Sequence, residues 1–550
     1  MKTIFMLLIC VCSAVCAAKP TMFGNVKGYT LTNSGAMLQF SHIVFENGKV
    51  LEIGDQTLLN QYPDSLFIDG QQKTMIPGLI DAHGHMLGLG NSLLKVDIRD
   101  VKSAQLSAKK VGDYAAQNDH LKWITGGGWN QVLWPDKQFP NAQQLDEYVS
   151  EKPVLLSRVD GHAAWANSKA LAIAGISKDT LDPPGGKIIR DSQGNPTGVL
   201  IDTAMYLVTK HLPNQSDDYY QASLNAATEH LHSVGITSVH DAGIEKAEYD
   251  FFKRLALEKN LDVRIYAMVW YEDPNLEAIL NAGYFNDAED FLSIRSVKAM
   301  ADGALGSRGA ALFENYADAP DNKGLLVIQE DQFKPLFDLV LKHDFQHNLH
   351  AIGDLANHLA LNQFEASFKD VGGKNLRNRI EHAQIISLND IPRFKQLDII
   401  PSMQPTHATS DMNMAEDRLG KDRLLGAYAW KRFIDQGSPL PLGSDFPVEL
   451  ANPFYGIHAA VTRQDRNNQP VGGWVPSQAL SLQQTFKGFT IDAAYAAHQE
   501  DIIGGLTKNK WADFILIDQD IFSIDKDQIW KTKVLETWVA GKRVYQAKPN

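Results

Sequence analysis

The stretch that organises this chain is Thr74-Met-Ile-Pro-Gly-Leu-Ile-Asp81-Ala-His83-Gly-His85. Apolar residues lead into two histidines spaced i, i+2, with a Pro-Gly pair just upstream. At the end of a strand, side chains i and i+2 point to the same side, so both imidazoles can reach one metal ion. A His-x-His pair alone fits two ordinary polar residues equally well, so its meaning depends on partners elsewhere in the chain.

The composition is that of an ordinary globular protein, and its charge argues against a nucleic-acid partner. Of the 550 residues, 44% are hydrophobic and 21% are charged, and this length allows several domains or one large barrel with an accessory domain. The net charge of -13 is not offset by any basic stripe, which argues against a nucleic-acid partner.

The N-terminus has the pattern of a secretory signal peptide. A basic start, Met1-Lys2, precedes an apolar run and the small residues Ala17 and Ala18, where cleavage is expected. All three cysteines lie before Ala17, so the mature protein would contain none. No other segment approaches the length of an apolar membrane span. We therefore expect an exported protein, periplasmic or secreted, with no membrane span.

Both ends of the chain have a β-rich texture. Short strand-like runs cover residues 29–53, with a hairpin signal at Asn47-Gly48, and residues 512–518 and 534–545 have the same character. This pattern predicts one small β-sandwich built from both ends, although two unrelated edge ribbons are the alternative.

Between these flanks, short apolar runs alternate with helical stretches, which predicts an α/β fold of the TIM-like (β/α)₈ barrel type. The eight expected strands are Thr74–Asp81, Ile236–His240, Val263–Val269, Ile294–Met300, Gln346–His350, Arg379–His382, Asp398–Ser402 and Pro439–Asp445. The first two are too far apart for a normal loop, so we expect an inserted subdomain at about 92–231. The expected organisation is a signal peptide (1–18), an N-terminal sandwich segment (19–73), the barrel (74–490) and a C-terminal sandwich segment (491–550).

Residues able to ligate metals recur at or near the ends of five expected strands. They are His83 with His85, Lys298, His350, His382 and Asp445. In such barrels, catalytic groups sit where strands end and loops begin. Each residue taken singly has a plain alternative, namely a polar strand end, a paired surface histidine or a turn residue. Their shared placement favours a common metal site.

These motifs resemble the amidohydrolase superfamily, and most closely its amidohydrolase-3 branch of YtcJ-like and N-substituted formamide deformylase-like proteins. The motifs are Pro77-Gly-Leu-Ile-Asp-Ala-His83-Gly-His85, Val297-Lys298-Ala-Met-Ala-Asp302-Gly303, His350-Ala-Ile-Gly-Asp354, Arg379-Ile-Glu-His382 and Gly443-Ser-Asp445. The segments Gly126-Gly-Gly-Trp129 and Asp160-Gly-His162-Ala-Ala-Trp165 in the expected insertion also match. The resemblance covers nearly everything after the signal peptide and identifies a chemistry rather than a substrate.

The resemblance implies two divalent cations, most simply Zn²⁺, which suits imidazole nitrogen with carboxylate oxygen. His83 and His85 would hold the first cation, and His350 and His382 the second. Lys298 would bridge them as an N-carboxylated carbamate, because an ammonium cannot ligate a cation. The alternative is that Lys298 pairs with Asp302 or another carboxylate, which leaves one metal or a differently bridged pair.

The implied reaction is hydrolysis of a non-peptide C–N bond in an amide, formamide, carbamate or cyclic amide by metal-activated hydroxide. Asp445 would ligate the first metal and act as general base and then general acid. His162 is a further catalytic candidate that could donate to the substrate. Expected substrate contacts, each with an equally good structural reading, are Trp165, His240, Asp302, Arg308, Gln404 and His407.

Two other readings of the function stay open. The chain could be a mononuclear deacylase or deaminase that uses only some of the ligands. It could also be a catalytically silent exported binding protein on the same scaffold. The expected partner is a small-molecule substrate, and a homodimer is expected from base rates alone.

Overall fold

A computed structural model describes residues 19–548 except 100, 120, 132–133, 159–162, 184–185, 213–215 and 307. Two compact units divide the chain. One unit contains residues up to His85 and residues from Glu229 onward, and the other is the inserted segment Met86–Thr228. The predicted signal peptide lies outside the described residues, and the predicted insertion at 92–231 corresponds to this second unit.

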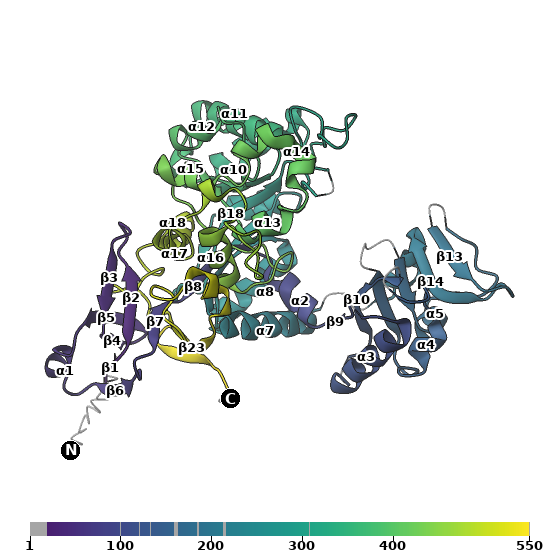
Figure 1. The fold of residues 1–550 in the computed structure, drawn as a ribbon, viewed down its shortest axis with the longest axis horizontal. Helices are drawn as coiled ribbons and strands as arrows, with labels where there is room; N and C mark the ends of the chain where they lie inside the picture. The colour runs from purple at the N-terminus through teal and green to yellow at the C-terminus, as the bar shows by residue number, and fades with distance from the viewer. Residues whose placement is uncertain are drawn as a thin grey trace, which may run out of the picture. The chain divides into compact units, whose positions relative to one another are not determined.

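The two ends of the chain form a β-sandwich of two sheets, as predicted (Figure 1). The first sheet has the order β5 (Lys49–Gly54), β4 (His42–Glu46), β1 (Thr21–Gly24) and β6 (Leu66–Asp69). The second has the order β24 (Lys542–Gln546), β23 (Val534–Val539), β22 (Phe514–Ile517), β7 (Thr74–Pro77), β2 (Lys27–Leu31) and β3 (Met37–Phe40). The buried side chains Phe23 and Phe45 from one sheet pack against Phe514 and Trp538 from the other.

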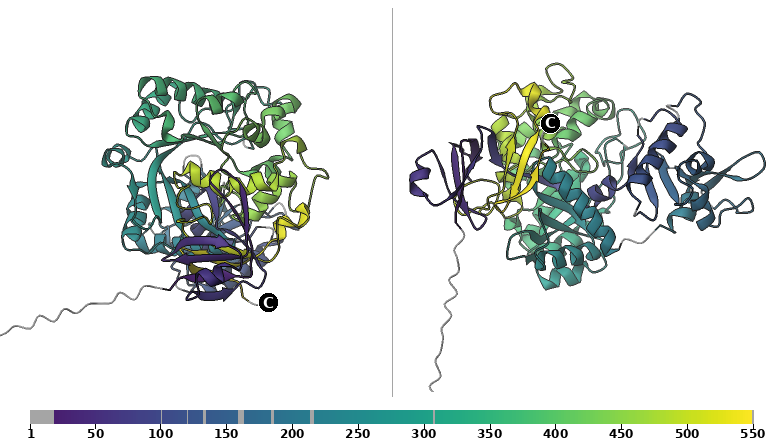
Figure 2. Two further views of the ribbon diagram at one scale, coloured as in Figure 1. Left: turned by 90° about the vertical axis from the view of Figure 1, so that its left-hand side faces the viewer. Right: turned by 90° about the horizontal axis from the view of Figure 1, so that it is seen from below.

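A parallel barrel forms the rest of this unit, as predicted. Its strands run in the order β8 (Leu79–Gly84), β15 (Ile236–Ile244), β16 (Arg264–Trp270), β18 (Leu292–Met300), β19 (Gln346–Ala351), β20 (Arg379–His382) and β21 (Ile400–Ser402). A short strand, β17 (Phe285–Asn286), pairs antiparallel with β18. The ring of strands is seen in the left view of Figure 2, with helices around it.

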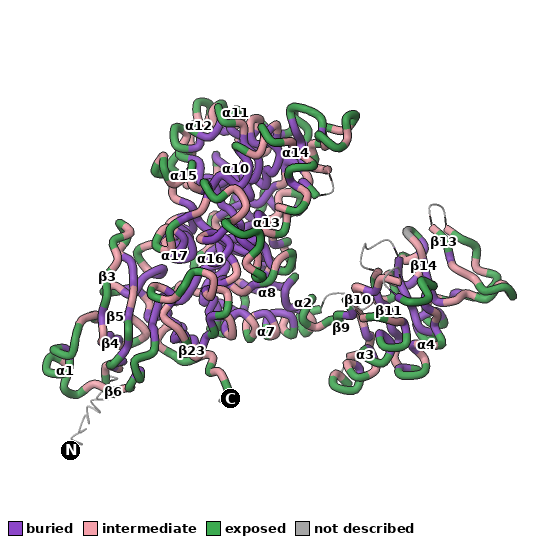
Figure 3. Tube along the Cα trace, in the orientation of Figure 1, coloured by how far each residue is buried: buried purple, intermediate pink, exposed green. Residues whose placement is uncertain are grey.

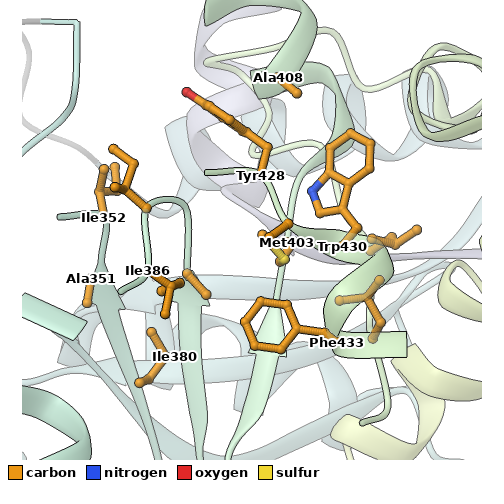
Figure 4. Close-up of a cluster of buried hydrophobic side chains, with 14 of the residues drawn as sticks. Ala351, Ile352, Ile380, Ile386, Met403, Ala408, Tyr428, Trp430 and Phe433 are labelled. Carbon is orange, nitrogen blue, oxygen red and sulfur yellow. The ribbon is translucent and has the colours of Figure 1, made fainter. Parts of the chain in front are cut away.

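Helices cover the outside of the barrel, where their solvent faces are exposed (Figure 3). They are α8 (Lys246–Leu257), α9 (Leu276–Ala282), α10 (Glu330–Lys342), α11 (Asp354–Asp370), α12 (Ile391–Gln396), α13 (Pro405–Asp411), α14 (Ala415–Arg423), α15 (Trp430–Asp435), α16 (Pro453–Thr462), α17 (Leu482–Gly488) and α18 (Ile491–Ala496). Helix α7 (Asp217–Ser233) begins in the inserted segment and ends in the barrel unit. Figure 4 shows how buried side chains such as Met403, Trp430 and Phe433 fill the space between strands and helices.

The predicted strand Thr74–Asp81 is two strands in the structure. Residues up to Pro77 pair with β22 in the sandwich, and Leu79 begins the barrel strand. The break falls at Gly78, where a Cβ atom would lie 2.2 Å from Thr237 Oγ1. Pro77 also has no N–H to donate. One residue therefore separates the sandwich from the strand that carries His83.

The predicted eighth strand, Pro439–Asp445, is not a regular strand, yet this segment closes the barrel. Leu442 forms a parallel bridge with Met403, and Phe446 forms one with Gly84. The Asp445 N–H donates to His83 O at 2.7 Å. Two prolines, Pro439 and Pro441, lack the N–H that a ladder needs, and Asp445 has φ of 66°. These features explain why the pairing is interrupted.

The inserted unit has its own mixed sheet and core. The strands run in the order β13 (Gly186–Arg190), β14 (Pro196–Asp202), β12 (Ala163–Ala166), β11 (Val154–Arg158), β10 (Ile124–Trp129) and β9 (Val96–Asp97). The helices are α2 (Met86–Leu93), α3 (Ala104–Gln117), α4 (Ala142–Asp146), α5 (Ser168–Ile173) and α6 (Tyr206–Thr209). Trp129, Trp134 and Trp165 are buried in this core.

Candidate metal centre

The carboxyl ends of the barrel strands bring imidazoles and one carboxylate together around Asp445. The Oδ1 atom of Asp445 lies 3.2 Å from His85 Nε2 and 3.7 Å from His83 Nε2. Its Oδ2 atom lies 3.5 Å from His407 Nε2. Each carboxylate oxygen therefore faces imidazole nitrogen. His83 lies on β8, His85 directly follows that strand, Asp445 follows residue 442, and His407 lies on α13.

Two further histidines, His350 and His382, extend this group. The ring centroids of His350 and His382 are 4.5 Å apart, and those of His83 and His382 are 4.8 Å apart. His382 comes from the end of β20 and His350 from β19, which is the neighbouring strand. The structure thus brings together four predicted ligands, His83, His85, His382 and Asp445, with His350 beside them.

Hydrogen bonds at the far side of the rings orient two of these histidines. The Nδ1 atom of His83 lies 2.7 Å from Glu381 Oε2, and the Nδ1 atom of His382 lies 2.8 Å from Gln404 Oε1. An imidazole that donates from Nδ1 presents its Nε2 lone pair on the other side. Both rings therefore keep Nε2 as the coordinating nitrogen.

Glu381 is a site residue that the sequence prediction missed. It is fully buried on β20, and Arg379 from the same strand has Nη1 3.7 Å from Glu381 Oε1. Arg379 in turn donates to His240 Nδ1 at 2.9 Å and to Ala496 O. No local pattern marks this role, because the partner His83 is 298 positions away in the sequence.

Lys298 lies within this group from the middle strand of the barrel. Its side chain is buried, and Nζ is 3.4 Å from His83 Nε2. Among the described residues, no carboxylate lies within ion-pair distance of Nζ. Burial lowers the pKa of this amine, and the carboxylates of Glu381 and Asp445 oppose that shift. The amine of Lys298 is therefore buried beside the imidazole of His83 and forms no ion pair within the described residues.

Two residues of the cluster have a backbone conformation that costs free energy. His382 has φ of 73° and Asp445 has φ of 66°, and Ala383 follows with 43°. Non-glycine residues rarely occupy this left-handed region, and those that do concentrate at functional sites. At the same place, a Cβ atom on Gly443 would lie 2.5 Å from Asp81 Oδ1. The chain passes so closely here that only glycine fits.

Burial and neighbouring charges set the protonation states of the cluster. Burial lowers the pKa of His83 and His382 well below the usual value, and that of His350 to about 3. Burial alone would raise the pKa of Asp445, but the hydrogen bond from His85 and the nearby His83 and His407 hold it below its usual range. Neutral imidazoles beside an ionised carboxylate are the form that binds a cation.

The residues present fit a divalent metal ion. His83, His85 and Asp445 each offer one donor atom, and these atoms lie within 4.8 Å of one another, as do those of His382, His407 and Asp445. The Nε2 atoms of His350 and His407 are buried and have no hydrogen-bond partner. Buried polar atoms are normally satisfied, so these two nitrogens are suited to bind a metal ion. Nitrogen with carboxylate oxygen is a donor set suited to Zn²⁺.

The remaining predicted substrate contacts have partners within the protein. Asp302 accepts backbone N–H groups of Ala311, Ile352 and Gly353, and burial raises its pKa to about 7. Arg308 forms a two-contact ion pair with Asp318.

Trp165 is buried within the inserted unit, where its Nε1 donates to Asn141 O at 2.8 Å. His162 lies outside the described residues.

The comparisons with known proteins agree on one family. The sequence model of the amidohydrolase-3 family, described as Amidohydrolase family, matches residues 66–545. The Protein LONG AFTER FAR-RED 3 of Arabidopsis thaliana is 33% identical over 94% of this chain and 90% of its own length. The protein YtcJ of Bacillus subtilis is 30% identical over 94% of this chain and 98% of its own length.

Two further relatives extend this agreement to an enzyme and to a solved structure. An N-substituted formamide deformylase of Arthrobacter pascens is 23% identical over 95% of this chain and 97% of its own length. The crystal structure of a metal-dependent hydrolase from Pyrococcus horikoshii superimposes with a TM-score of 0.76 at 26% identity, covering 92% of this chain and 99% of that one. With its barrel, its metal-binding donor set and a family match over most of its length, the chain belongs to the amidohydrolase family.

Proposed function

We propose that this protein hydrolyses a non-peptide C–N bond, in an amide, formamide, carbamate or cyclic amide, with Asp445 as the proton carrier. The observation that carries this proposal is the convergence of imidazole nitrogens on both oxygens of Asp445. The family supplies the reaction class, and the formamide deformylase among the relatives supports a C–N bond.

The proposed ligands of a first cation are His83, His85 and Asp445, and those of a second are His350 and His382, with Lys298 carboxylated between them. Zinc is the proposed metal. Such cations would supply Lewis acidity, which polarises a substrate carbonyl and lowers the pKa of a water molecule so that it can lose a proton.

The chain's own groups handle the proton. Asp445 accepts it as the C–O bond forms and delivers it to the nitrogen as the C–N bond breaks, which yields an acid and an amine. Its ionised state suits the first step. Glu381 and Gln404 keep the ligand rings in orientation.

His407 faces the second oxygen of Asp445. We propose that it holds that carboxylate and contacts the substrate. His162 remains a proposed catalytic residue.

A mononuclear hydrolase is the second candidate function. The three donor atoms of His83, His85 and Asp445 could hold one cation. This group needs neither His350 nor His382, the proposed ligands of the second cation. One equivalent of bound zinc, together with full activity of Lys298→Ala, would favour this version.

The proposal is tested by screening the zinc-loaded protein against N-acyl amino acids, formamides, carbamates and cyclic amides, with amine release as the readout. We expect turnover of at least one class, which chelation abolishes and added zinc restores. Zinc binding without turnover of any C–N substrate would leave the silent binding protein as the better description. We also propose that residues 1–18 direct export, for which the N-terminal sequence of the mature protein is the test.

A further inference from the structure

His83 and His382 are each held by a hydrogen bond at Nδ1, and the two partners differ chemically. His83 Nδ1 meets a carboxylate oxygen of Glu381 at 2.7 Å, whereas His382 Nδ1 meets an amide oxygen of Gln404 at 2.8 Å. All four side chains are at least nine-tenths buried. The geometry of the two hydrogen bonds is nearly the same, so the difference between them is charge.

Charge at this position changes what the imidazole offers to a metal ion. A carboxylate that accepts the Nδ1–H pushes electron density toward Nε2 and makes the ring a stronger donor, while a neutral amide mainly fixes its orientation. Changing such a partner commonly alters metal affinity by about 10- to 100-fold. The two positions should therefore differ in affinity.

A buried guanidinium, that of Arg379, lies next to Glu381. Its Oε1 atom has no hydrogen-bond partner and lies 3.7 Å from Arg379 Nη1. Arg379 is itself fixed by His240 Nδ1 and Ala496 O, and its guanidinium lies 5.2 Å from the ring centre of Tyr266. A fully buried guanidinium needs a nearby anion, and Glu381 is the carboxylate that forms an ion pair with it.

Gln404 presents a neutral amide instead of a carboxylate. Its Nε2 donates to Ser402 O at 3.3 Å, which leaves Oε1 as the atom that faces His382. Gln404 directly precedes Pro405, the first residue of α13. The amide is thus held in one orientation by the backbone.

We propose that Glu381 and Gln404 make the two metal positions unequal: Glu381, through His83, makes the first position the tighter one, and Gln404, through His382, leaves the second the more exchangeable. Both are positioning residues that act through a ligand histidine. This inference rests on the proposed binuclear site and adds an order of loading to it.

The test measures zinc affinity directly, without turnover. Metal-free protein is titrated with zinc in competition with chromophoric chelators of graded affinity. For the wild type we expect two equivalents with clearly separated dissociation constants. Glu381→Gln should weaken the tight equivalent about tenfold or more and leave the weak one within about threefold. Gln404→Glu should tighten the weak equivalent and leave the tight one unchanged.

A matched control is Glu500→Gln, because Glu500 pairs with Arg377 and contacts no ligand histidine. It should leave both dissociation constants unchanged. Cobalt substitution adds a spectroscopic readout, since the visible bands of the tight equivalent should shift in Glu381→Gln only. If Glu381→Gln does not fold, Gln404→Glu still tests the proposal in the opposite direction.

The outcomes separate this inference from the proposed function. Two equivalents of equal affinity, or a Glu381→Gln change that affects both equally, would overturn the inference alone. A single bound equivalent would overturn it and leave the mononuclear hydrolase in place. No zinc binding at all would overturn both.

Discussion

The carboxyl end of the barrel and the core of the inserted unit both contain polar motif residues in buried surroundings, yet they differ in how those atoms are satisfied. In the inserted unit, Trp129 and Trp165 donate to backbone carbonyls, and Asn167 makes contacts through both side-chain atoms. At the barrel end, the Nε2 atoms of His350 and His407 have no hydrogen-bond partner, and each lies 3.5 to 3.6 Å from a carboxylate oxygen. Internally satisfied motifs serve folding, whereas motifs with open positions mark a ligand site.

The largest expected effect is on catalysis at Asp445. Asp445→Asn removes the proton acceptor while keeping the shape of the side chain, so kcat should fall by about 10³-fold once a substrate is known. The thermal midpoint of the metal-free protein should change little, because the residue supports metal binding and chemistry rather than packing. Steady-state kinetics and thermal unfolding test these two expectations. An unchanged kcat would remove Asp445 from the mechanism.

A substitution of a motif residue in the inserted unit should instead lower the free energy of unfolding. Trp165→Ala leaves a cavity in a closed core and should cost about 3–5 kcal/mol in the free energy of unfolding of that unit. Zinc content should stay the same. Trp165→Phe keeps the ring but not the donor to Asn141 O, so it should cost less. If Trp165→Phe instead raised KM at constant stability, the substrate role expected for Trp165 would stand and the comparison would fail.

Metal removal should lower the stability of the barrel unit but not that of the inserted unit. A cation that binds only the folded barrel stabilises it by about 4 kcal/mol at a concentration 1,000 times its dissociation constant. Chelation should therefore lower the unfolding midpoint of the barrel and leave that of the inserted unit unchanged. Hydrogen exchange resolved along the chain measures each unit by itself. Equal loss of protection in both would show that the units unfold together.

A smaller difference in stability between the two units is expected when the pH is lowered. Burial lowers the pKa of His232 to about 4 and those of His347 and His498 to about 3. Histidines whose folded pKa lies below the unfolded value of 6.5 take up protons on unfolding, so they give full stability above pH 6.5 and lose it as pH falls toward their folded pKa. Each should contribute about 1 kcal/mol or more.

The inserted unit should escape this acid effect. Its one described histidine, His211, is exposed, and no buried histidine occurs among the residues of Met86–Thr228 that the structure describes. Urea unfolding of the metal-free protein at pH 7 and pH 5 tests the difference. Parallel destabilisation of both units would contradict it.

Much of this architecture could be predicted from the sequence, because strand periodicity and turn chemistry are local. The predicted barrel strands around His350 and His382 agree with the structure to within one residue. The split at Gly78 escapes prediction because it depends on Thr237 in a distant strand. The irregular pairing of the eighth strand was not predicted, because the apolar composition of residues 439–445 favours a strand despite the two prolines.

The ligand candidates were identifiable because strand ends concentrate chemistry in such barrels. Glu381 was not, since its role appears only when His83, from a strand far away in sequence, lies 2.7 Å from it. Trp165 shows the converse. Its motif matched the family, but whether an indole faces a substrate or a core is decided by packing that one sequence does not display.

The single residue between β7 and β8 has a consequence for how the protein is made. Strand β7 pairs with β2, which is synthesised before it, and with β22, which follows about 440 residues later, so its second sandwich neighbour is made only when nearly the whole chain has been synthesised. A growing chain would therefore emerge from the ribosome with its first metal ligands held from one side of β7 only. The metal centre should mature after translation, and truncation near the C-terminus should impair it from a distance.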